Sequence, residues 1–310
     1  MSQVNLKQAY QYCNRTAREH YENFPVASHL LPRKLRRPIT VIYTFSRMAD
    51  DIVDEGTASK TERNLQLQQC RDQLDAAARH RHNTSTDNIA PVYIALADVL
   101  QQHPDLLSHL HDLLTAFQMD IDKDRYQNFA EVMQYCKLSA NPIGRMLLIL
   151  YDADTEKNRA CSDGLCSALQ LINFLQDIRA DYHIRSRIYL PEDELQANRI
   201  SEQDIADSPA IPQLKTLMEF QIQRARKLLQ AGAPLGIQLK GRIGLELRMI
   251  TLGGWIILKK LREQKGDLSR SPRLNNRDWL WILIRAISAR FTVYLNTFTK
   301  TPKQRQTHDS

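Results

Sequence analysis

The chain has 310 residues, and only 10 of them are glycine, well below an average usage of about 7%. Long stretches rich in Leu, Ala, Gln and Arg, without a run of alternating β-branched residues, favour helices and give no indication of a sheet. The five cysteines contain no CxxC pair, which argues against a disulfide framework or zinc site and favours a reducing, cytoplasmic setting. The N-terminus lacks the basic-then-apolar pattern of a signal peptide.

Charge is distributed unevenly along the chain. Residues 221–310 carry 18 Lys and Arg against 5 Asp and Glu, whereas the first 220 residues carry 24 against 30. A basic C-terminal third suggests attraction to an anionic surface, either phosphate or the inner face of a membrane. A merely solvated face explains it equally well. The apolar stretch 279–295 contains Arg285 and Arg290 and is shorter than the roughly 20 residues of a membrane span, so we expect peripheral contact only.

Helical periodicity runs through most of the chain and predicts ten helices without a long linker. They are expected at residues 3–21, 33–55, 61–81, 91–101, 104–120, 128–150, 158–184, 212–231, 236–263 and 276–296. We therefore expect a single all-α domain over residues 1–298, followed by a disordered tail at 299–310.

Proline marks most of the predicted breaks. Pro32 and Pro38 are expected at the start of the second helix, where a missing N–H is tolerated. Asn141-Pro142 should kink or break the sixth helix. The stretch 187–191, which ends in proline, is expected to be extended, and the polar stretch 80–88 to be a loop.

The first cluster of candidate functional residues is acidic. Asp50 and Asp54 are i,i+4 neighbours on one face of the predicted helix, with Asp51 beside them. Their apolar surroundings raise the cost of leaving these carboxylates unpaired. Mg²⁺ would relieve this repulsion, because it takes carboxylate oxygens and keeps sites open for phosphate. The alternative is an acidic patch at a helix end, and this cluster alone does not decide between them.

A second cluster repeats the pattern further along the chain. Asn173, Asp177 and Asp181 stand four residues apart and form one polar stripe on an otherwise apolar helix, which Gln170 extends by a turn. A solvated face would contain more Lys and Glu. The alternative is that Asp177 pairs with a neighbouring arginine at the surface.

Two such stripes on separate helices favour a metal–diphosphate site. Diphosphate leaves only when cations neutralise the developing charge, and facing carboxylate helices can hold two or three Mg²⁺ ions around it. Arg47 and Arg187 could add bidentate phosphate contacts, although Arg47 could equally pair with Asp51. Tyr135 and Phe24 are candidates to line a carbocation cavity, since aromatic faces attract cations; each could also be an ordinary core residue.

The pair of motifs, Asp50-x3-Asp54 and Asn173-x3-Asp177-x3-Asp181, resembles the two metal motifs of the squalene/phytoene synthase family. The resemblance extends over residues 21–281 and includes the stretch from Arg187 to Tyr189. It implies an isoprenoid-synthase-type helical bundle around a deep apolar cavity that metals cap. It also implies a prenyl diphosphate substrate and a set of functional residues. Mg²⁺ would be held by Asp50, Asp51, Asp54, Asn173, Asp177 and Asp181, with catalysis at the aspartates and Tyr135, and with Phe24, Arg47, Gln170, Asn173, Asn141, Arg187 and Tyr189 binding substrate.

Two segments, 22–28 and 139–145, are most similar to the hydroxysqualene-forming bacterial branch of the family, which serves hopanoid biosynthesis. Phytoene-forming and presqualene-forming relatives commonly have Val-Ala-Gly near the second segment and Arg at the position of Gln176. The resemblance implies that presqualene diphosphate is ionised and captured by water. Asn141 could hold that water, or could serve only to break the helix. A presqualene diphosphate or phytoene synthase is the nearest rival.

Two other classes of protein remain as alternatives. His111-Asp112 on a helix suggests an HD-type phosphohydrolase, but His103 and His109 offer no convincing further ligands. A non-catalytic helical module that docks on a membrane through its basic C-terminus would leave both acidic stripes unexplained.

Overall fold

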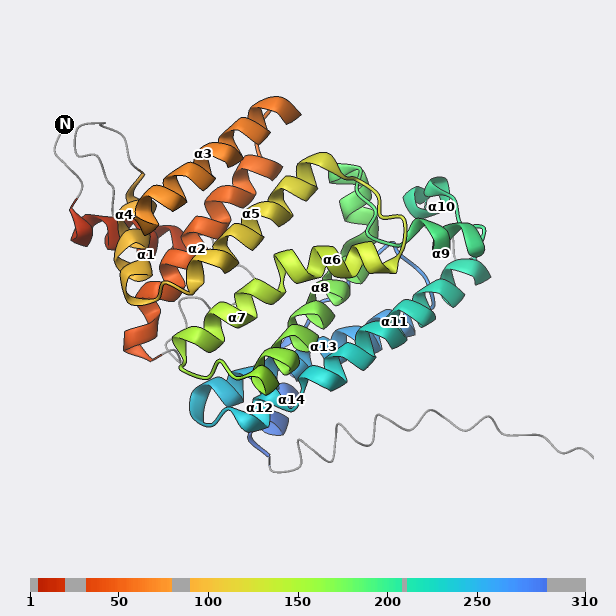
Figure 1. The fold of residues 1–310 in the computed structure, drawn as a ribbon. Coiled ribbons are helices and arrows are strands. Elements are labelled where there is room, and N and C mark those ends of the chain that lie inside the picture. The colour runs from red at the N-terminus through yellow and green to blue at the C-terminus, as the bar shows by residue number, and fades with distance from the viewer. Residues whose placement is uncertain (1–4, 20–31, 80–89, 208–210, 289–310) are drawn as a thin grey trace, which may run out of the picture.

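A computed structural model describes residues 5–19, 32–79, 90–207 and 211–288, and within these ranges the chain is helical (Figure 1). The described residues contain no β-strand, and their single β-bridge joins Arg125 to Ile188. The predicted all-α fold is therefore confirmed. No helix in these ranges is both long enough and apolar enough to cross a membrane.

The described ranges contain the following helices in chain order. They are α1 Leu6–Glu19, α2 Arg33–Asp54, α3 Lys60–Ala78, α4 Pro91–Gln102, α5 Leu106–Asp122, α6 Phe129–Ser139, α7 Asn141–Leu150, α8 Glu156–Arg185, α9 Glu192–Ala197, α10 Glu202–Asp207, α11 Pro212–Gly232, α12 Leu235–Gln238, α13 Gly241–Glu263 and α14 Asn276–Ile287.

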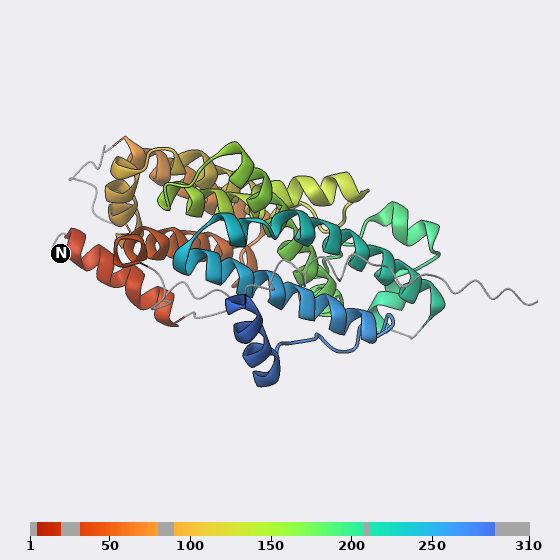
Figure 2. The same cartoon turned by 90° about the horizontal axis from the view of Figure 1, so that it is seen from below.

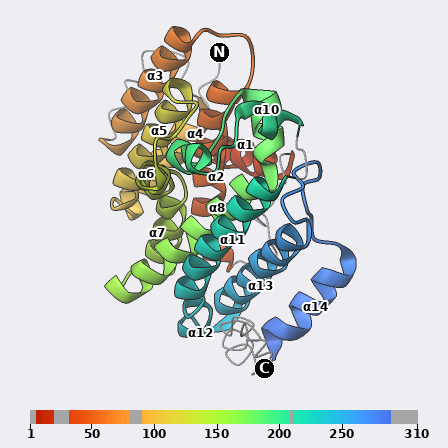
Figure 3. The same cartoon turned by 90° about the vertical axis from the view of Figure 1, so that its right-hand side faces the viewer.

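The helices bury two large groups of apolar side chains. The first is formed by α1 to α5 together with α7, and the second by α5, α6, α8 and the later helices α11 and α13. The 30-residue α8 packs against α7, α11 and α13. Figure 3 shows α11 running beside α8, with α10 near one end of α11 and α12 near the other. Since α5 contributes to both groups, it joins the α2 side of the molecule to the α8 side.

The breaks follow the predicted chemistry with one exception. Asn141 is the first residue of α7 and Pro142 the second, so the predicted sixth helix divides at Ala140. The stretch 187–191 is extended, as predicted. Pro38, however, lies inside α2 rather than at its start, because a proline in the second turn removes only one intrahelical hydrogen bond.

Some elements differ from the prediction or cannot be compared with it. The short helices α9, α10 and α12 were not predicted, since four to six residues are too few to show a period. The helix predicted at 276–296 is described only to Ile287, after which Ser288 is extended. The polar stretch 80–88, Phe24 and the segment 22–28, and the tail 299–310 lie outside the described residues.

Candidate active site

The first acidic motif occupies the last two turns of α2, which ends at Asp54. Arg63, from the first turn of α3, holds this end of the helix. Its guanidinium group donates to the backbone carbonyls of Ile52, Val53, Gly56 and Ala58. The last carbonyls of a helix lack intrahelical partners, and here one side chain satisfies carbonyls on both sides of the turn. The carboxylates of α2 are therefore presented by a firmly anchored helix end.

The second acidic motif lies on α8. Asp177 accepts a hydrogen bond of 3.0 Å from Oγ of Ser271, and Asp181 is largely buried. Asn173 is exposed and Gln170 half-buried on the same helix. Gln176, next to Asp177 in the sequence, donates its side-chain amide to the carbonyl of Pro272 at 2.7 Å. The loop between α13 and α14 thus rests on this end of α8.

The two motifs meet through Arg185, the last residue of α8, and Arg187, which follows that helix. Nη2 of Arg185 lies 2.7 Å from Oδ2 of Asp54, and its Nη1 lies 3.4 Å from Oδ1 of Asp181. Nη1 of Arg187 lies 3.4 Å from Oδ1 of Asp54, and Nη2 donates to the carbonyl of Asp120 at 2.9 Å. The structure therefore brings together Asp54 and Asp181, which are 127 positions apart in the sequence.

Arg187 also contacts a carboxylate outside the two motifs, that of Asp120, which the sequence analysis missed. Asp120 of α5 is buried, and the hydroxyl of Tyr135 donates to its Oδ2 at 2.7 Å. The hydroxyl of Tyr189 lies 3.3 Å from Oδ1. A signal was available, because Asp120 follows Leu113 and Phe117 at helical spacing and so falls on the apolar stripe of α5. A carboxylate on that stripe is expensive unless it is paired.

Aromatic rings cover the inner side of this carboxylate. Phe174 and Tyr189 stack with 3.7 Å between ring centroids, and Tyr135 lies 5.9 Å from Phe174 and 5.7 Å from Tyr189. Tyr126 packs against Tyr135 and Tyr189 at 5.9 and 5.6 Å. The structure thus places Tyr135 and Tyr189 in one aromatic cluster, of which Tyr126 and Phe174 are unpredicted members. Such a cluster presents π-faces that can stabilise a cation.

Burial and mutual repulsion shift the protonation of these carboxyl groups. Burial raises the pKa of Asp181 to about 6, and Asp177 and Asp54 add to the shift while Arg185 opposes it. Burial also raises the pKa of Asp120 to about 6, against the effects of Arg187 and Tyr135. The pKa of Asp50 rises to about 6 through burial and the nearby Asp54, although 41% of its side chain remains exposed.

Arg187 stays charged within this cluster. Burial alone would lower its pKa, but the negative charges of Asp120 and Asp54 outweigh burial, so that the pKa lies above its ordinary value. Tyr135 stays neutral, because burial and Asp120 raise its pKa well above the ordinary value. The cluster therefore contains fixed positive charges, neutral phenols and carboxylates that prefer a cationic partner.

Other candidate residues occupy different positions. Arg47 contacts Asp51 at 2.7 Å and Glu55 at 3.1 Å, so its guanidinium is engaged by its own helix end. Asn141 is buried, and its side-chain oxygen accepts from Ser167 of α8 at 2.9 Å, which ties α7 to α8. The roles assigned to both residues in substrate binding stay predictions.

The donor set at this site fits a hard divalent cation. It consists of carboxylate oxygens and one amide, which are the ligands that Mg²⁺ prefers. Among the described residues, no three His, Cys, Asp or Glu side chains converge closely enough to hold one ion by themselves. This is compatible with Mg²⁺, which commonly binds through one or two carboxylates together with water and substrate phosphates.

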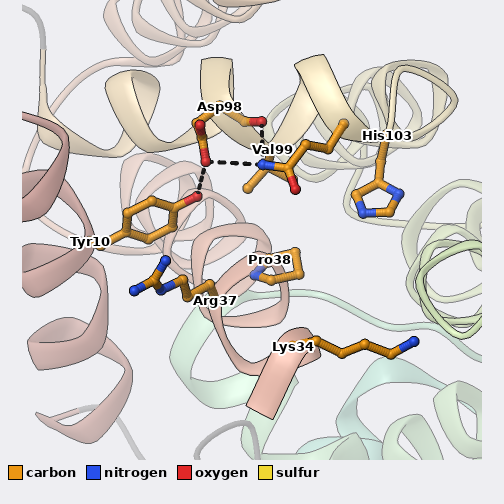
Figure 4. Close-up of a pocket in the computed structure, with 8 residues that line it drawn as sticks. Tyr10, Lys34, Arg37, Pro38, Asp98, Val99 and His103 are labelled. Carbon is orange, nitrogen blue, oxygen red and sulfur yellow. Dashed lines mark hydrogen bonds between the residues drawn. The ribbon is translucent and has the colours of Figure 1, made fainter. Parts of the chain in front are cut away.

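A cavity of about 410 Å³ lies elsewhere on the molecule (Figure 4). Its lining includes Lys34, Arg37 and Asp98, and the hydroxyl of Tyr10 donates to Asp98 at 2.6 Å. Lys34 precedes Asp50 by 16 residues on α2, or about 24 Å along the helix. This charged cavity is distinct from the deep apolar cavity expected between the motifs, which stays a prediction.

The sequence model of squalene/phytoene synthases matches residues 17–279. The chain belongs to the squalene/phytoene synthase family. The resemblance to this family is thereby confirmed, and the chain is a prenyltransferase-like enzyme of isoprenoid biosynthesis. The phosphohydrolase alternative is wrong, because family membership accounts for most of the chain; His111 of its motif lies 2.9 Å from Asp75.

Individual relatives within the squalene/phytoene synthase family carry two names. The chain is 36% identical to a hydroxysqualene synthase from Rhodopseudomonas palustris, over 74% of this chain and 75% of the relative. It is 30% identical to a phytoene synthase from Mycobacterium tuberculosis, over 75% of this chain and 74% of the relative. A crystal structure of a squalene synthase from Alicyclobacillus acidocaldarius superposes with a TM-score of 0.76 at 29% identity, covering 85% of this chain and 97% of that one.

Proposed function

We propose that this enzyme converts presqualene diphosphate and water into hydroxysqualene and diphosphate in a Mg²⁺-dependent reaction. The observation that carries the proposal is the meeting of two acidic helix faces, with Asp54 of α2 and Asp181 of α8 held by the same guanidinium of Arg185. Carboxylates that face one another across a gap can share cations with a polyanionic substrate.

Asp50, Asp51 and Asp54 would hold the metal from one side, and Asn173, Asp177 and Asp181 from the other. Bound Mg²⁺ would neutralise the diphosphate as it departs. Arg187, fixed between Asp54 and Asp120, would contact the departing group through its remaining donors. Arg47, from the last turns of α2, would do the same when it exchanges Asp51 for phosphate.

The hydrocarbon would extend over the aromatic cluster. When the C–O bond breaks, the electron pair leaves with the diphosphate and a cyclopropylcarbinyl cation remains. The rings of Tyr135, Phe174 and Tyr189 would stabilise that positive charge, while the three-membered ring opens. A water molecule then bonds to the cation and loses a proton, which gives the alcohol. We assign the positioning of this water to Asn141, whose side chain lies buried between α7 and α8.

The choice among reactions of the family rests on two supports. Relatives named hydroxysqualene synthase share 33–36% identity with the chain, and Gln176 stands where the phytoene-forming branch commonly has Arg. In this protein the amide of Gln176 donates a hydrogen bond to the carbonyl of Pro272 and so holds the loop against α8. The alternative is a presqualene diphosphate or phytoene synthase, which joins two prenyl diphosphates head to head.

Product analysis in labelled water tests the proposal. The full-length enzyme is incubated with presqualene diphosphate and Mg²⁺ in H₂¹⁸O, without NADPH, and the extracted lipid is weighed by mass spectrometry. We expect a C30 alcohol that is heavier by one ¹⁸O. An unlabelled alcohol, squalene formed only with NADPH, or turnover only from farnesyl or geranylgeranyl diphosphate would assign the enzyme to another branch.

A further inference from the structure

One side of α14 is apolar and faces away from the rest of the protein. The side chains concerned are exposed by 42–65%: Trp279, Leu280, Leu283, Ile284 and Ile287. Positions 280, 283, 284 and 287 follow the i, i+3, i+4, i+7 spacing of a single helix face, to which residue 279 is adjacent. A solvated helix would carry polar residues here. These five side chains are called the outer face of α14 below.

The opposite side of the same helix is the one that packs on the protein. Ile282 and Ala286 are buried against Leu252 of α13, and the amine of Lys260 contacts Asp278 at 2.5 Å. Asn275 and Asp278 form a capping box that fixes the first turn. Both sides of α14 are thus apolar, and the outer face cannot turn inward without breaking these contacts.

The apolar surface continues onto α12. The guanidinium of Arg248 donates to the carbonyl of Ala286 at 2.7 Å and to that of Gly236 at 2.8 Å. It therefore holds the C-terminal end of α14 beside α12, where Ile237 is also exposed. Figure 2 shows α14, in dark blue, standing at the edge of the molecule.

The charged residues around this surface are predominantly basic. Arg273 and Arg277 are exposed at the start of α14, and Lys240 and Arg242 are exposed beside α12. The nearest carboxylate on α14, Asp278, is engaged by Lys260. An apolar helix face with a tryptophan and a basic rim matches the boundary of an anionic bilayer, where apolar side chains enter the acyl layer and cations meet lipid phosphates.

We propose that the outer face of α14, extended by Ile237, docks this enzyme on an anionic lipid bilayer. The helix stays packed on α13 and lies along the membrane surface, with the basic rim against the headgroups. This inference rests on α14 and its neighbours and holds whichever prenyl diphosphate the enzyme uses. It also gives the basic C-terminal third of the sequence a specific location of contact.

Vesicle flotation with the full-length protein tests the inference. Vesicles of phosphatidylglycerol and phosphatidylcholine are compared with vesicles of phosphatidylcholine alone, at low and high salt. We expect binding to the anionic vesicles that weakens as salt screens the rim. Ile284→Glu should reduce binding about tenfold or more, because it removes an apolar group that would enter the acyl layer and adds a charge that anionic lipids repel. Arg277→Gln should reduce binding and its salt dependence by a smaller factor.

Leu65→Glu is the matched control, because Leu65 on α3 and Ile284 are both 60% exposed. It should leave binding unchanged, and circular dichroism should show that both variants are folded. Fluorescence gives an independent measurement: Trp279 emission should shift to the blue on binding, and Trp279→Phe should abolish the shift.

Three outcomes would overturn the inference. The first is no flotation at low salt. The second is a wild-type dimer in sedimentation that Ile284→Glu converts to monomer, which would assign the outer face to a second copy. The third is binding that arises only after residues 289–310 are deleted, which would mean that the chain covers its own helix.

Discussion

Nη2 of Arg185 lies 2.7 Å from Oδ2 of Asp54, so a residue at the end of α8 neutralises a carboxylate at the end of α2. We expect Arg185→Gln to destabilise the metal-free protein by about 1 kcal/mol, a modest value because the guanidinium is partly exposed. Millimolar Mg²⁺ should restore much of the loss by taking over the neutralisation. Urea unfolding with EDTA and with Mg²⁺ measures both effects. Lys259→Gln breaks an exposed pair with Glu263 and should change neither the stability nor its response to Mg²⁺. An equal loss of stability in both variants would contradict a specific role of Arg185 in neutralising Asp54.

The two acidic motifs should be jointly required for catalysis. Asp50→Asn and Asp177→Asn each remove a carboxylate from one side of the site, and each should lower kcat by about 100-fold or more while the fold is retained. EDTA should abolish turnover, and added Mg²⁺ should restore it. Asp72→Asn, at an exposed position of α3, is the matched control. Near-normal rates in both site variants would refute the model of two cooperating motifs.

The raised pKa values near 6 of Asp181 and Asp120 predict an unusual pH dependence of stability. In the unfolded chain these groups titrate near 4, so between about pH 4 and 6 the folded protein binds more protons than the unfolded one. The free energy of unfolding should therefore fall as pH rises through this window, by up to about 3 kcal/mol per group.

This pH effect should be visible in urea unfolding with EDTA, followed from pH 4.5 to 7.5. Asp181→Asn should flatten the slope, because the substituted amide does not titrate. Mg²⁺ should raise Tm more at pH 7.5 than at pH 5.5, since it binds the ionised carboxylates. If the free energy of unfolding instead rose with pH by the same amount in the wild type and in Asp181→Asn, buried carboxylates with raised pKa values would be excluded as the cause.

Tyr135→Phe should be costly for a change of one oxygen. It removes the 2.7 Å hydrogen bond to the buried Asp120, and an incompletely satisfied buried carboxylate costs about 1–3 kcal/mol. We expect lower stability together with reduced turnover. Tyr10→Phe removes a comparable 2.6 Å bond to Asp98 outside the site, and it should leave turnover unchanged. Equal turnover in the two variants would remove Tyr135 from the reaction.

Two glycines of α13 should respond oppositely to alanine. A Cβ at Gly244 would come within 1.8 Å of the carbonyl oxygen of Leu239, whereas a Cβ at Gly253 would make ordinary contact with Leu274 at 3.5 Å. Gly244→Ala should therefore destabilise the protein by about 2 kcal/mol or more. Gly253→Ala should stabilise it by up to about 1 kcal/mol through helix propensity. Thermal unfolding of the two variants compares them within one helix.

The sequence predicted the long helices well because their apolar residues repeat with the helical period over many turns. It also predicted both acidic motifs, since carboxylates at i and i+4 within apolar helices are locally visible. It could not show that Arg185 joins Asp54 to Asp181, because that contact depends on how α2 and α8 are placed. Asp120 escaped notice for a related reason: a single acidic residue on α5 becomes informative only when Tyr135 and Arg187 are seen around it.

The anchoring of α2 by Arg63 has a consequence for how a ligand is received. Because the side chain fixes carbonyls on both sides of the turn that ends α2, the positions of the acidic residues are settled when the protein folds. Little conformational entropy then remains to be lost when metal and substrate bind. The binding free energy is therefore not reduced by the cost of ordering these side chains and can stabilise the departing diphosphate. The end of α2 is thus held rigid by Arg63 of α3, a helix from which we assign no residue to the reaction itself.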